Sequence, residues 1–263
     1  MTSRLKAVPL RRSEVKEKVL CIDRLSKGFH TAAGYLSVLD DVSFEAESGE
    51  LIAILGRSGC GKSTLLKIVA GFIPPGSGNV LLNQKPVTGP GPDRCVIFQE
   101  DALFPWLTVG ENIAFGLKGQ KQSGKSRATE MNRFLKLVGL NEFRDYLPGE
   151  LSGGMKQRVA LARVLILKPS VLLMDEPFAS LDAQSREEMQ NLLLRLWKEL
   201  SHTILFVTHD VNEAVILADR ILLMDKNPGR VREEIRVNLP RPRKRESSAF
   251  MDVSRRLNEA LRD

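Results

Sequence analysis

Gly56-Arg57-Ser58-Gly59-Cys60-Gly61-Lys62-Ser63 follows the apolar run Leu51–Leu55 and leads into a helical pattern over Lys62–Ala70. A glycine-rich loop between a strand and a helix is the setting in which backbone N–H groups wrap phosphate groups. Glycines let the backbone approach phosphates without side-chain clashes, and the helix N-terminus adds a partial positive charge. An ordinary glycine-rich turn is the alternative interpretation. The stretch predicts a nucleotide phosphate site.

The residues of this loop have different expected roles. Lys62 is expected to bring a cation to the β- and γ-phosphate oxygens, and Ser63 to offer its hydroxyl to Mg²⁺. Cys60 lies near a helix N-terminus, a position that can lower a thiol pKa. A reactive thiol and a tolerated small residue are both consistent with this position. The residues expected to contact the nucleotide here are Gly56, Ser58, Gly59, Cys60, Gly61, Lys62, Ser63 and Thr64.

A second apolar run, Val171–Met174, ends in two adjacent carboxylates, Asp175 and Glu176. Ligands bind at the C-terminal ends of strands in open α/β sheets, and two carboxylates there are costly without a cation or a proton. We expect Asp175 to hold Mg²⁺ and Glu176 to polarise the attacking water as general base. A strand that simply ends in an acidic turn is the alternative.

Apolar runs of strand length alternate with helical patterns along most of the chain, which favours a parallel sheet covered on both faces. Cys95–Phe98 is short and apolar, as in a buried strand. Helical patterns dominate from about residue 100 to 168, which predicts a helical insertion between two strands. The other expected strands are Val19–Ile22, Val42–Ala46, Asn79–Leu82, Thr203–Val207 and Arg220–Met224, and the other helices are Val109–Leu117, Arg127–Val138, Gly153–Leu167, Gln184–Leu200 and Asp210–Ala218.

The composition fits a globular protein of the cytosol. Hydrophobic residues make up 43% and charged residues 27% of the 263 residues, which is ordinary for such a protein. The longest apolar runs are far shorter than a membrane span, and the N-terminus lacks the apolar core of a signal peptide. Cys21, Cys60 and Cys95 are odd in number and have no metal-ligand spacing, which favours a reducing compartment.

The two ends of the chain carry much of its net charge of +7. Residues 1–18 are polar and basic without periodicity, which predicts a loose tail. Residues 241–263 are expected to form a basic linker and an amphipathic helix, which packs on the domain or, alternatively, serves as an interface. The helical stripe consists of Phe250, Val253, Leu257 and Leu261. We interpret the basic side chains of the ends as solvated: Arg4, Lys6, Arg11, Arg12, Arg241, Arg243, Lys244 and Arg245.

Leu151-Ser152-Gly153-Gly154-Met155-Lys156-Gln157 lies shortly before the strand that ends in Asp175-Glu176. On its own, Ser152 is explained as a helix N-cap followed by flexible glycines. Together with the phosphate loop and Gln99, however, this stretch makes residues 19–237 resemble the ATPase subunit of an ABC transporter. Lys156 departs from the family's signature, since many members carry glutamine there.

The resemblance implies the fold class and the domain organisation. The fold is expected to be α/β, a P-loop NTPase with a mainly parallel sheet core, an antiparallel β subdomain and an inserted α-helical subdomain. The ABC ATPase domain is expected to span residues 19–240, with the helical subdomain at about 100–168.

The resemblance also implies a site shared between two copies of the chain. Ser152, Gly153 and Gly154 are expected to contact the γ-phosphate bound to the other subunit, so that ATP drives a head-to-tail homodimer with two-fold symmetry. Asp182 belongs to a D-loop, Ser180-Leu181-Asp182, which crosses the dimer interface in this family. Without the resemblance, Asp182 is a plain helix N-cap.

Three further residues acquire roles only through the resemblance. Gln99 is expected to sense Mg²⁺ and the γ-phosphate, and His209 to orient the attacking water and the γ-phosphate. Phe29 lies where the family stacks an aromatic ring on adenine, and Tyr35 is its rival. We favour Phe29 because Ala32–Leu36 has the pattern of a loop insertion. Lys62, Gln99, Glu176 and His209 are thus the expected catalytic residues.

Partners are implied in the same way. Permease subunits of the membrane are expected to dock near Gln99–Trp106, which places the chain on the cytoplasmic face of the membrane. The apolar cluster of Leu103, Phe104 and Trp106 is therefore either core or docking surface. A separate extracytoplasmic binding protein is expected to supply the solute.

Three stretches resemble importers for nitrate, sulfonates, taurine and related small solutes. They are Gly89-Pro90-Gly91-Pro92-Asp93-Arg94, Phe104-Pro105-Trp106 and Asn227-Pro228-Gly229-Arg230.

Other functions fit less well. A soluble ABC ATPase that acts on nucleic acid or ribosomes is the main alternative, but the basic tails are not interleaved with aromatic residues as a nucleic-acid groove requires. A GTPase would need an Asn-Lys-x-Asp motif, which the sequence lacks, and a small-molecule kinase does not use Leu151–Gln157. A subunit that only binds nucleotide is disfavoured by Glu176, Lys62 and His209. We therefore expect ATP and Mg²⁺ as ligands and no nucleic acid.

Overall fold

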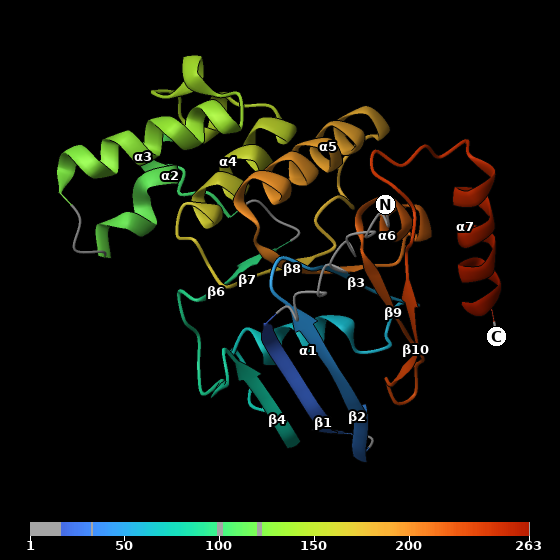
Figure 1. Cartoon of the computed structure of the whole chain (residues 1–263). Coiled ribbons are helices and arrows are strands. Elements are labelled where there is room, and N and C mark those ends of the chain that lie inside the picture. Colours follow the sequence, from blue (N-terminus) through green and yellow to red (C-terminus); the bar gives the residue numbers. More distant parts are fainter. Residues whose placement is uncertain (1–16, 33, 99–101, 120–122, 263) are drawn as a thin grey trace, which may run out of the picture.

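Two β-sheets organise the protein, whose computed structural model describes residues 17–32, 34–98, 102–119 and 123–262. Most of the predicted N-terminal tail and Gln99 lie outside these ranges. The larger sheet is central, with the smaller sheet on one side of it and the helices α2 (Val109–Ala114), α3 (Gly124–Leu137) and α4 (Gly153–Leu165) on another (Figure 1). Within the described ranges, no helix combines the length and apolarity needed to cross a membrane.

The central sheet has the strand order β10-β9-β3-β8-β7-β6. Its neighbours pair in parallel except β10, which pairs antiparallel with β9. Because β3 and β8 are buried along their whole length, both faces of the sheet are covered. The C-terminal ends of β3, β7 and β8 meet at one edge. The strands are β3 (Leu51–Gly56), β6 (Arg94–Ile97), β7 (Val171–Asp175), β8 (Thr203–Thr208), β9 (Arg220–Met224) and β10 (Val231–Arg236).

The smaller sheet is antiparallel, in the order β2-β1-β4-β5. β1 (Lys18–Thr31) and β2 (Gly34–Glu47) form a hairpin, whereas β4 (Ser77–Leu82) and β5 (Lys85–Pro86) return along its other edge. The prediction of a loop insertion at Ala32–Leu36 is wrong for its last three residues, because β2 already begins at Gly34, which pairs with Thr31. Tyr35 pairs with His30 and Leu36 with Phe29, because the two strands remain paired up to the turn.

Two hydrophobic cores lie against opposite faces of the central sheet. Alternate residues of β3 divide between them: Leu51, Ala53 and Leu55 contribute to one core, and Ile52 and Ile54 to the other. This division follows from the two-residue period of a strand. The antiparallel sheet and α1 (Lys62–Val69) build the second core. The first core contains residues of α2, α3, α4, α5 (Ala183–Leu200), α6 (Val211–Leu217) and α7 (Ser248–Ala260).

Side-chain caps begin several of these helices. Thr108 caps α2 in a reciprocal capping box with Glu111, and Asp210 caps α6 by accepting the backbone N–H groups of Asn212 and Glu213. Such caps satisfy N–H groups that have no partner within the helix. α2 is shorter than the predicted helix Val109–Leu117, because the chain continues as a 3₁₀ helix, η1 (Phe115–Gly119). Two more short 3₁₀ helices precede α4: η2 (Asn141–Phe143) and η3 (Pro148–Glu150).

β6 differs from the buried strand predicted at Cys95–Phe98. It is one of the two edge strands of the central sheet, and within the described ranges β7 is the only strand of that sheet that pairs with it, so its residues are half-buried. Phe98 lies beyond its end, is 43% exposed and stacks on Phe72 with ring centroids 5.9 Å apart. An apolar run of four residues cannot distinguish an edge strand from a central one.

The C-terminal segment packs on the domain, as the helical stripe predicts. Phe250 and Leu257 of α7 are buried in the core, and Val253 and Leu261 pack against it. α7 lies at the opposite end of the molecule from α3 (Figure 1). The apolar stripe therefore holds α7 against its own domain.

Two arginines of the linker are structural, so the expectation that they are solvated is wrong. Arg241 places its guanidinium 4.6 Å from the centroid of the Trp197 ring. Arg243 is 8% exposed and donates to the carbonyls of Val215 and Ala218, both at 2.6 Å, at the C-terminal end of α6. Burial, followed by the charge of Arg241, lowers the Arg243 pKa to about 10, so the guanidinium is still charged at neutral pH.

We expect Arg243→Ala to lower the free energy of unfolding by about 3 kcal/mol, because hydrogen bonds from a charged donor each contribute about 1.5–3 kcal/mol and the carbonyls left behind are buried. Urea denaturation followed by circular dichroism measures the effect. Lys244→Ala, a change of the exposed neighbour, is the control and should stay within about 0.5 kcal/mol of wild type. Equal losses in both variants would contradict a structural role for Arg243.

Candidate nucleotide site

The predicted phosphate loop joins the end of β3 to the start of α1. Gly59 and Gly61 have φ angles of 82° and 93°, left-handed values that favour glycine. A side chain at Gly61 would also collide with Leu39. Ser58 is exposed, whereas Cys60 is buried. The loop thus exposes its backbone to solvent at the N-terminus of α1, in conformations that favour glycine.

Lys62 is anchored inside this loop. Its side chain is buried, and Nζ donates to the carbonyl oxygens of Gly56 at 2.8 Å and Arg57 at 3.1 Å. Both partners are neutral oxygens, so the ammonium charge is available to an anion held by the loop. The next helical positions, Ser63 and Thr64, are exposed and half-buried, respectively.

Ser63 and Asp175 meet across the sheet edge, as predicted. The Ser63 hydroxyl donates to Asp175 Oδ1 at 3.0 Å. Burial raises the Asp175 pKa, the hydrogen bond from Ser63 lowers it, and the charge of Glu176 raises it again. A hydroxyl and a carboxylate side by side are the hard oxygen ligands that Mg²⁺ takes alongside phosphate oxygens, and a cation there would favour the charged carboxylate. The pair therefore fits Mg²⁺.

Glu176 and His209 also come together, from the ends of two adjacent strands. His209 Nδ1 lies 3.1 Å from Glu176 Oε2, and β7 and β8 are neighbours in the sheet. Glu176 has a φ of 47°, a strained value for a residue with a side chain, of the kind that persists at functional sites. His209 is exposed and Glu176 half-buried. The carboxylate and imidazole thus face the same solvent-accessible space.

The backbone around His209 is held by a buried network that the sequence analysis did not predict. The Thr208 hydroxyl donates to Glu213 Oε2 at 2.7 Å and accepts the Asp210 N–H at 3.0 Å. Glu213 is only 5% exposed although its side chain ends in a carboxyl group. The sequence does give one signal. Glu213 lies three residues after the capping residue Asp210, a position from which its side chain points back toward the start of the helix.

The signature stretch begins α4. Ser152 caps this helix by accepting the Met155 N–H at 3.3 Å, and both Ser152 and Gly153 are exposed. Further along the stretch, Gln157 Nε2 donates to Ser180 Oγ at 3.5 Å. The signature helix therefore contacts the predicted D-loop of its own chain.

The predicted D-loop ends in the cap of α5. Asp182 accepts the Ser185 N–H at 3.0 Å and its hydroxyl at 2.6 Å. The bond from the hydroxyl, followed by the one from the N–H, lowers the Asp182 pKa. Asp182 is exposed, so its carboxylate is both charged and accessible.

The signature and the phosphate loop belong to different sides of the molecule. α4 contributes to the core on one face of the central sheet, whereas α1 contributes to the core on the other. Among the hydrogen bonds of the described residues, none joins Ser152, Gly153 or Gly154 to the phosphate loop. One chain therefore does not bring its own signature to its own phosphate loop.

Both candidates for an adenine contact lie on the β1–β2 hairpin. Phe29 is 38% exposed, with the Lys27 ammonium 5.3 Å from its ring centroid. Tyr35 is 67% exposed and lies edge-on to the His30 ring at 5.4 Å. Since Phe29 pairs with Leu36 and Tyr35 with His30, the two rings project from opposite faces of the hairpin. Each can cover a base on only one of these faces, and the preference for Phe29 stays a prediction.

Cys60 does not have the environment of a reactive thiol. It is 1% exposed, and burial raises its pKa, against smaller effects of Lys62 and of backbone N–H groups that lower it. Of the two interpretations that the sequence leaves open, a reactive thiol and a tolerated small residue, the structure favours the second, because the side chain packs in the core. The role of Cys60 is in packing, as a small side chain buried beneath the loop.

The predicted cluster after Gln99 divides between core and surface. Leu103 packs against the core, whereas Trp106 is 72% exposed. Phe104 lies between them, with ring centroids 5.7 Å from Trp106 and 4.4 Å from Phe115, which is itself 41% exposed. We call Phe104, Trp106 and Phe115 the aromatic surface. An exposed group of aromatic rings is typical of an interaction site.

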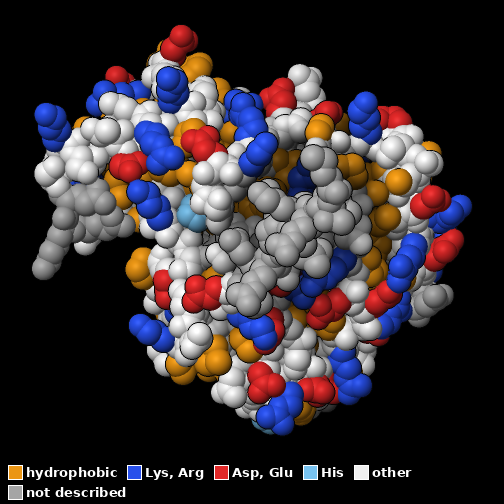
Figure 2. All heavy atoms as spheres, in the orientation of Figure 1, with side chains coloured by type: hydrophobic (Ala, Val, Ile, Leu, Met, Phe, Trp, Pro, Cys, Tyr) orange, Lys and Arg blue, Asp and Glu red, His pale blue; other side chains and the backbone are white. Residues whose placement is uncertain are grey.

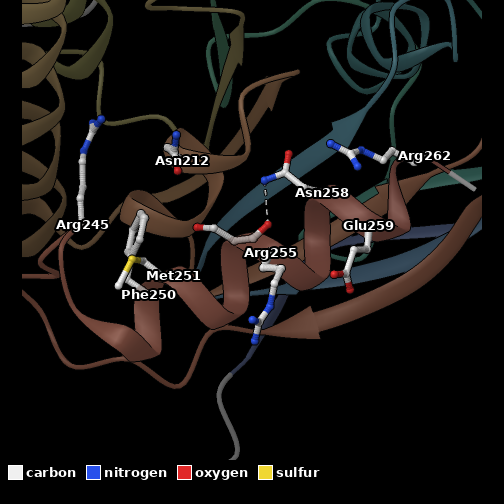
Figure 3. Close-up of a pocket in the computed structure, with 9 residues that line it drawn as sticks. Asn212, Arg245, Phe250, Met251, Arg255, Asn258, Glu259 and Arg262 are labelled. Atoms are coloured by element: carbon white, nitrogen blue, oxygen red, sulfur yellow. Dashed lines mark hydrogen bonds between the residues drawn. The ribbon is translucent and has the colours of Figure 1, made fainter.

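One sizeable cavity lies away from these residues. It measures about 620 Å³ and lies between α6 and α7 (Figure 3). Asn212, Phe250 and Arg255 are among its lining residues, and none of the predicted site residues is. Its volume therefore does not mark the nucleotide site, which is an open surface at the sheet edge.

Comparison with known proteins gives a consistent result. Residues 39–179 match the ABC transporter family. The chain is 48% identical to a taurine import ATP-binding protein of Roseobacter denitrificans over 221 residues, 83% of this chain and 82% of that one. It is 43% identical to a nitrate import ATP-binding protein of Synechococcus elongatus over 243 residues, 91% and 89% of the two chains.

A solved dimeric ATP-binding cassette in a post-hydrolysis state with ADP and Pi matches with a TM-score of 0.72 and 29% identity, over 84% of this chain and all of that one. The family match covers more than half of the chain, and the two named relatives align with most of it. The chain belongs to the ABC transporter family, as one of its ATP-binding subunits.

Proposed function

We propose that this chain is the ATP-hydrolysing subunit of an ABC importer whose solute is nitrate, a sulfonate, taurine or a related small compound. The contact between Glu176 and His209, with the Ser63–Asp175 pair at the same edge of the central sheet, is the observation that carries the hydrolytic part. The names of the relatives, taurine and nitrate import ATP-binding proteins, support the transport part.

The residues of the site divide the hydrolytic work. The phosphate loop and Lys62 bind the phosphates through backbone N–H groups and one cation. Glu176 accepts a proton from the attacking water, and His209 orients that water and the γ-phosphate. Ser63 and Asp175 would hold Mg²⁺, with Gln99 as a further predicted ligand. When bound, the ion neutralises charge on the phosphate oxygens.

Two copies of the chain are needed to complete each site. The signature and the phosphate loop belong to different faces of the central sheet in one chain, which supports the proposal that the signature that meets an ATP comes from a second copy. The exposed N-terminus of α4, with Ser152, Gly153 and Gly154, suits contact with a γ-phosphate because of its partial positive charge. A head-to-tail homodimer with two ATP molecules at its seam follows.

The aromatic surface is the proposed docking site for the permease. It directly follows the predicted γ-phosphate sensor Gln99 in sequence, and its exposed Trp106 offers apolar area for an intracellular loop of a membrane subunit. Binding at this surface would place the chain at the cytoplasmic face of the membrane. An extracytoplasmic solute-binding protein completes the proposed system.

The alternative of a soluble ATPase on nucleic acid has less support. Basic and acidic side chains are interspersed on the face seen in Figure 2, whereas binding to nucleic acid favours basic residues clustered on one face. Arg241 and Arg243, which contribute to the basic C-terminus, are occupied in donating to backbone carbonyls of α6.

The test is ATP hydrolysis by the chain assembled with its proposed permease partner, in liposomes that contain the matching binding protein. We expect taurine, an alkanesulfonate or nitrate to raise the turnover rate in wild type, and Trp106→Ala to remove this stimulation while basal hydrolysis persists. Arg256→Ala, a change of an exposed arginine paired with Glu233, is the control. Stimulation only by a cation, a sugar or a peptide would contradict the solute class.

A further inference from the structure

Arg186 connects two loops that end beside the proposed catalytic pair. It lies in the second turn of α5, and its Nη2 donates to the Leu181 carbonyl at 2.9 Å. Its Nε donates more weakly to the Phe178 carbonyl at 3.4 Å. Both carbonyls belong to the turn between Glu176 and Asp182. Arg186 therefore fixes the segment that directly follows the proposed general base.

The same guanidinium faces the network beneath His209. Arg186 Nε lies 3.7 Å from Glu213 Oε1, while the other oxygen of Glu213 accepts the Thr208 hydroxyl at 2.7 Å. Thr208 in turn accepts the N–H of Asp210. Thr208 and Asp210, which flank His209, are thus connected to Arg186 by one series of contacts.

A small cavity separates this chain of contacts from the catalytic pair. It measures about 80 Å³, and its walls include Glu176 and His209 together with Arg186 and Glu213. All four side chains therefore border one space. A movement of the Arg186 or Glu213 side chain would therefore alter the space beside Glu176 and His209, and it would also act on them through the backbone.

The charges in the network depend on one another. Burial raises the Glu213 pKa, whereas the bond from Thr208 and the charge of Arg186 lower it. Without Arg186, the Glu213 carboxylate would be buried without its nearest cation, which is unfavourable, and the carbonyl of Leu181 would lose its donor. Loss of one partner is therefore expected to rearrange the network rather than remove a single contact.

We infer that Arg186 and Glu213 are positioning residues that couple the D-loop segment to His209 and so keep the Glu176 carboxylate and the His209 ring within hydrogen-bond distance during hydrolysis. This role rests on the proposed hydrolytic function of Glu176 and His209. Neither Arg186 nor Glu213 needs to touch ATP. Their effect is on the geometry of groups that do.

Steady-state hydrolysis by single and double variants tests this role. Arg186→Ala should lower kcat about 100-fold, the scale of loss when catalytic groups shift by about 1 Å. KM for ATP should change less than about threefold, because the phosphate loop is untouched. Arg186→Lys should restore part of kcat, because lysine keeps a positively charged donor at this position.

A double-mutant cycle distinguishes coupling from general weakening. If the two residues act through one network, Arg186→Ala/Glu213→Gln should lose little more activity than the worse single variant. Thermal unfolding of each variant, with Arg256→Ala as the control, shows whether the protein is folded at the assay temperature. Additive losses in the cycle, or wild-type kcat in Arg186→Ala, would overturn the inference.

These experiments distinguish a failure of the positioning role from a failure of the proposed hydrolytic function. If Glu176→Gln abolishes hydrolysis and Arg186→Ala keeps wild-type kcat, only the positioning role is wrong. If Glu176→Gln itself keeps wild-type hydrolysis, the catalytic pair is wrongly identified, and with it the reason for the coupling.

Discussion

Glu176→Gln is expected to lower the rate of ATP hydrolysis by about 10²–10⁴-fold, the usual contribution of a positioned general base. The amide has nearly the same shape as the carboxylate but cannot accept the proton of the attacking water. His209 Nδ1 can still donate to the amide oxygen over the 3.1 Å contact, so the geometry of the pair should be kept. Phosphate release from Mg-ATP measures the rate.

ATP binding should persist in this variant, because Lys62 and the phosphate loop are unchanged. Light scattering with and without Mg-ATP should then show a stable dimer of the variant, whereas the wild-type dimer dissociates when its ATP is hydrolysed. Lys62→Ala is the matched control, since it loses the cation and should bind ATP too weakly to dimerise. An unchanged hydrolysis rate in Glu176→Gln would mean that another group accepts the proton.

The nucleotide site is the part of the protein that the sequence predicts best, because its elements are local. A buried strand, a glycine-rich loop and a helix lie within 20 residues, from Leu51 to Val69. Asp175 and Glu176 likewise end an apolar strand whose position in a parallel sheet fixes the edge they occupy. The meeting of Ser63 with Asp175 follows from that topology. Gln99 lies outside the described residues and stays a prediction.

Features that depend on distant contacts were the ones predicted wrongly or not at all. Arg243 has the appearance of a tail residue, yet its partners are carbonyls of α6 more than 20 residues earlier. Arg186 and Glu213 belong to different helices, and neither helix alone indicates that they meet. The strand pairing at Tyr35 was hidden by the small residues Ala32-Ala33-Gly34 before it, which have the pattern of a turn. In each case the local pattern is compatible with exposure, and tertiary packing decides.

Ser152→Arg is expected to abolish ATP-driven dimerisation of the Glu176→Gln protein. The serine is exposed at the N-terminus of α4, where the proposed dimer buries it against the γ-phosphate of the partner. A bulky side chain there would hold the two chains apart and replace the hydroxyl that contacts the phosphate. The dimer dissociation constant should rise at least about 100-fold, as for loss of a central contact of about 3 kcal/mol.

Ser247→Arg provides the matched control for the loss of a helix cap. Ser247 caps α7 by accepting the Phe250 N–H at 3.3 Å, the same geometry and distance as Ser152 with Met155. Each substitution costs about 1 kcal/mol of helix capping, but only Ser152→Arg lies at the proposed interface. If both variants lose dimerisation equally, helix destabilisation explains the effect and the shared site is not supported.

Mixing two inactive variants tests the head-to-tail arrangement directly. In a mixed dimer of Lys62→Ala and Ser152→Arg chains, both lesions fall in one composite site, and the other site combines an intact phosphate loop with an intact signature. Each variant alone has no intact site. In the complex with the proposed permease, which holds two chains side by side without ATP-driven dimerisation, mixing should therefore recover hydrolysis, to roughly a quarter of wild type, because about half of the randomly assembled pairs are mixed and each has one of two sites intact. No recovery, although mixed dimers form, would mean that each chain completes its own site.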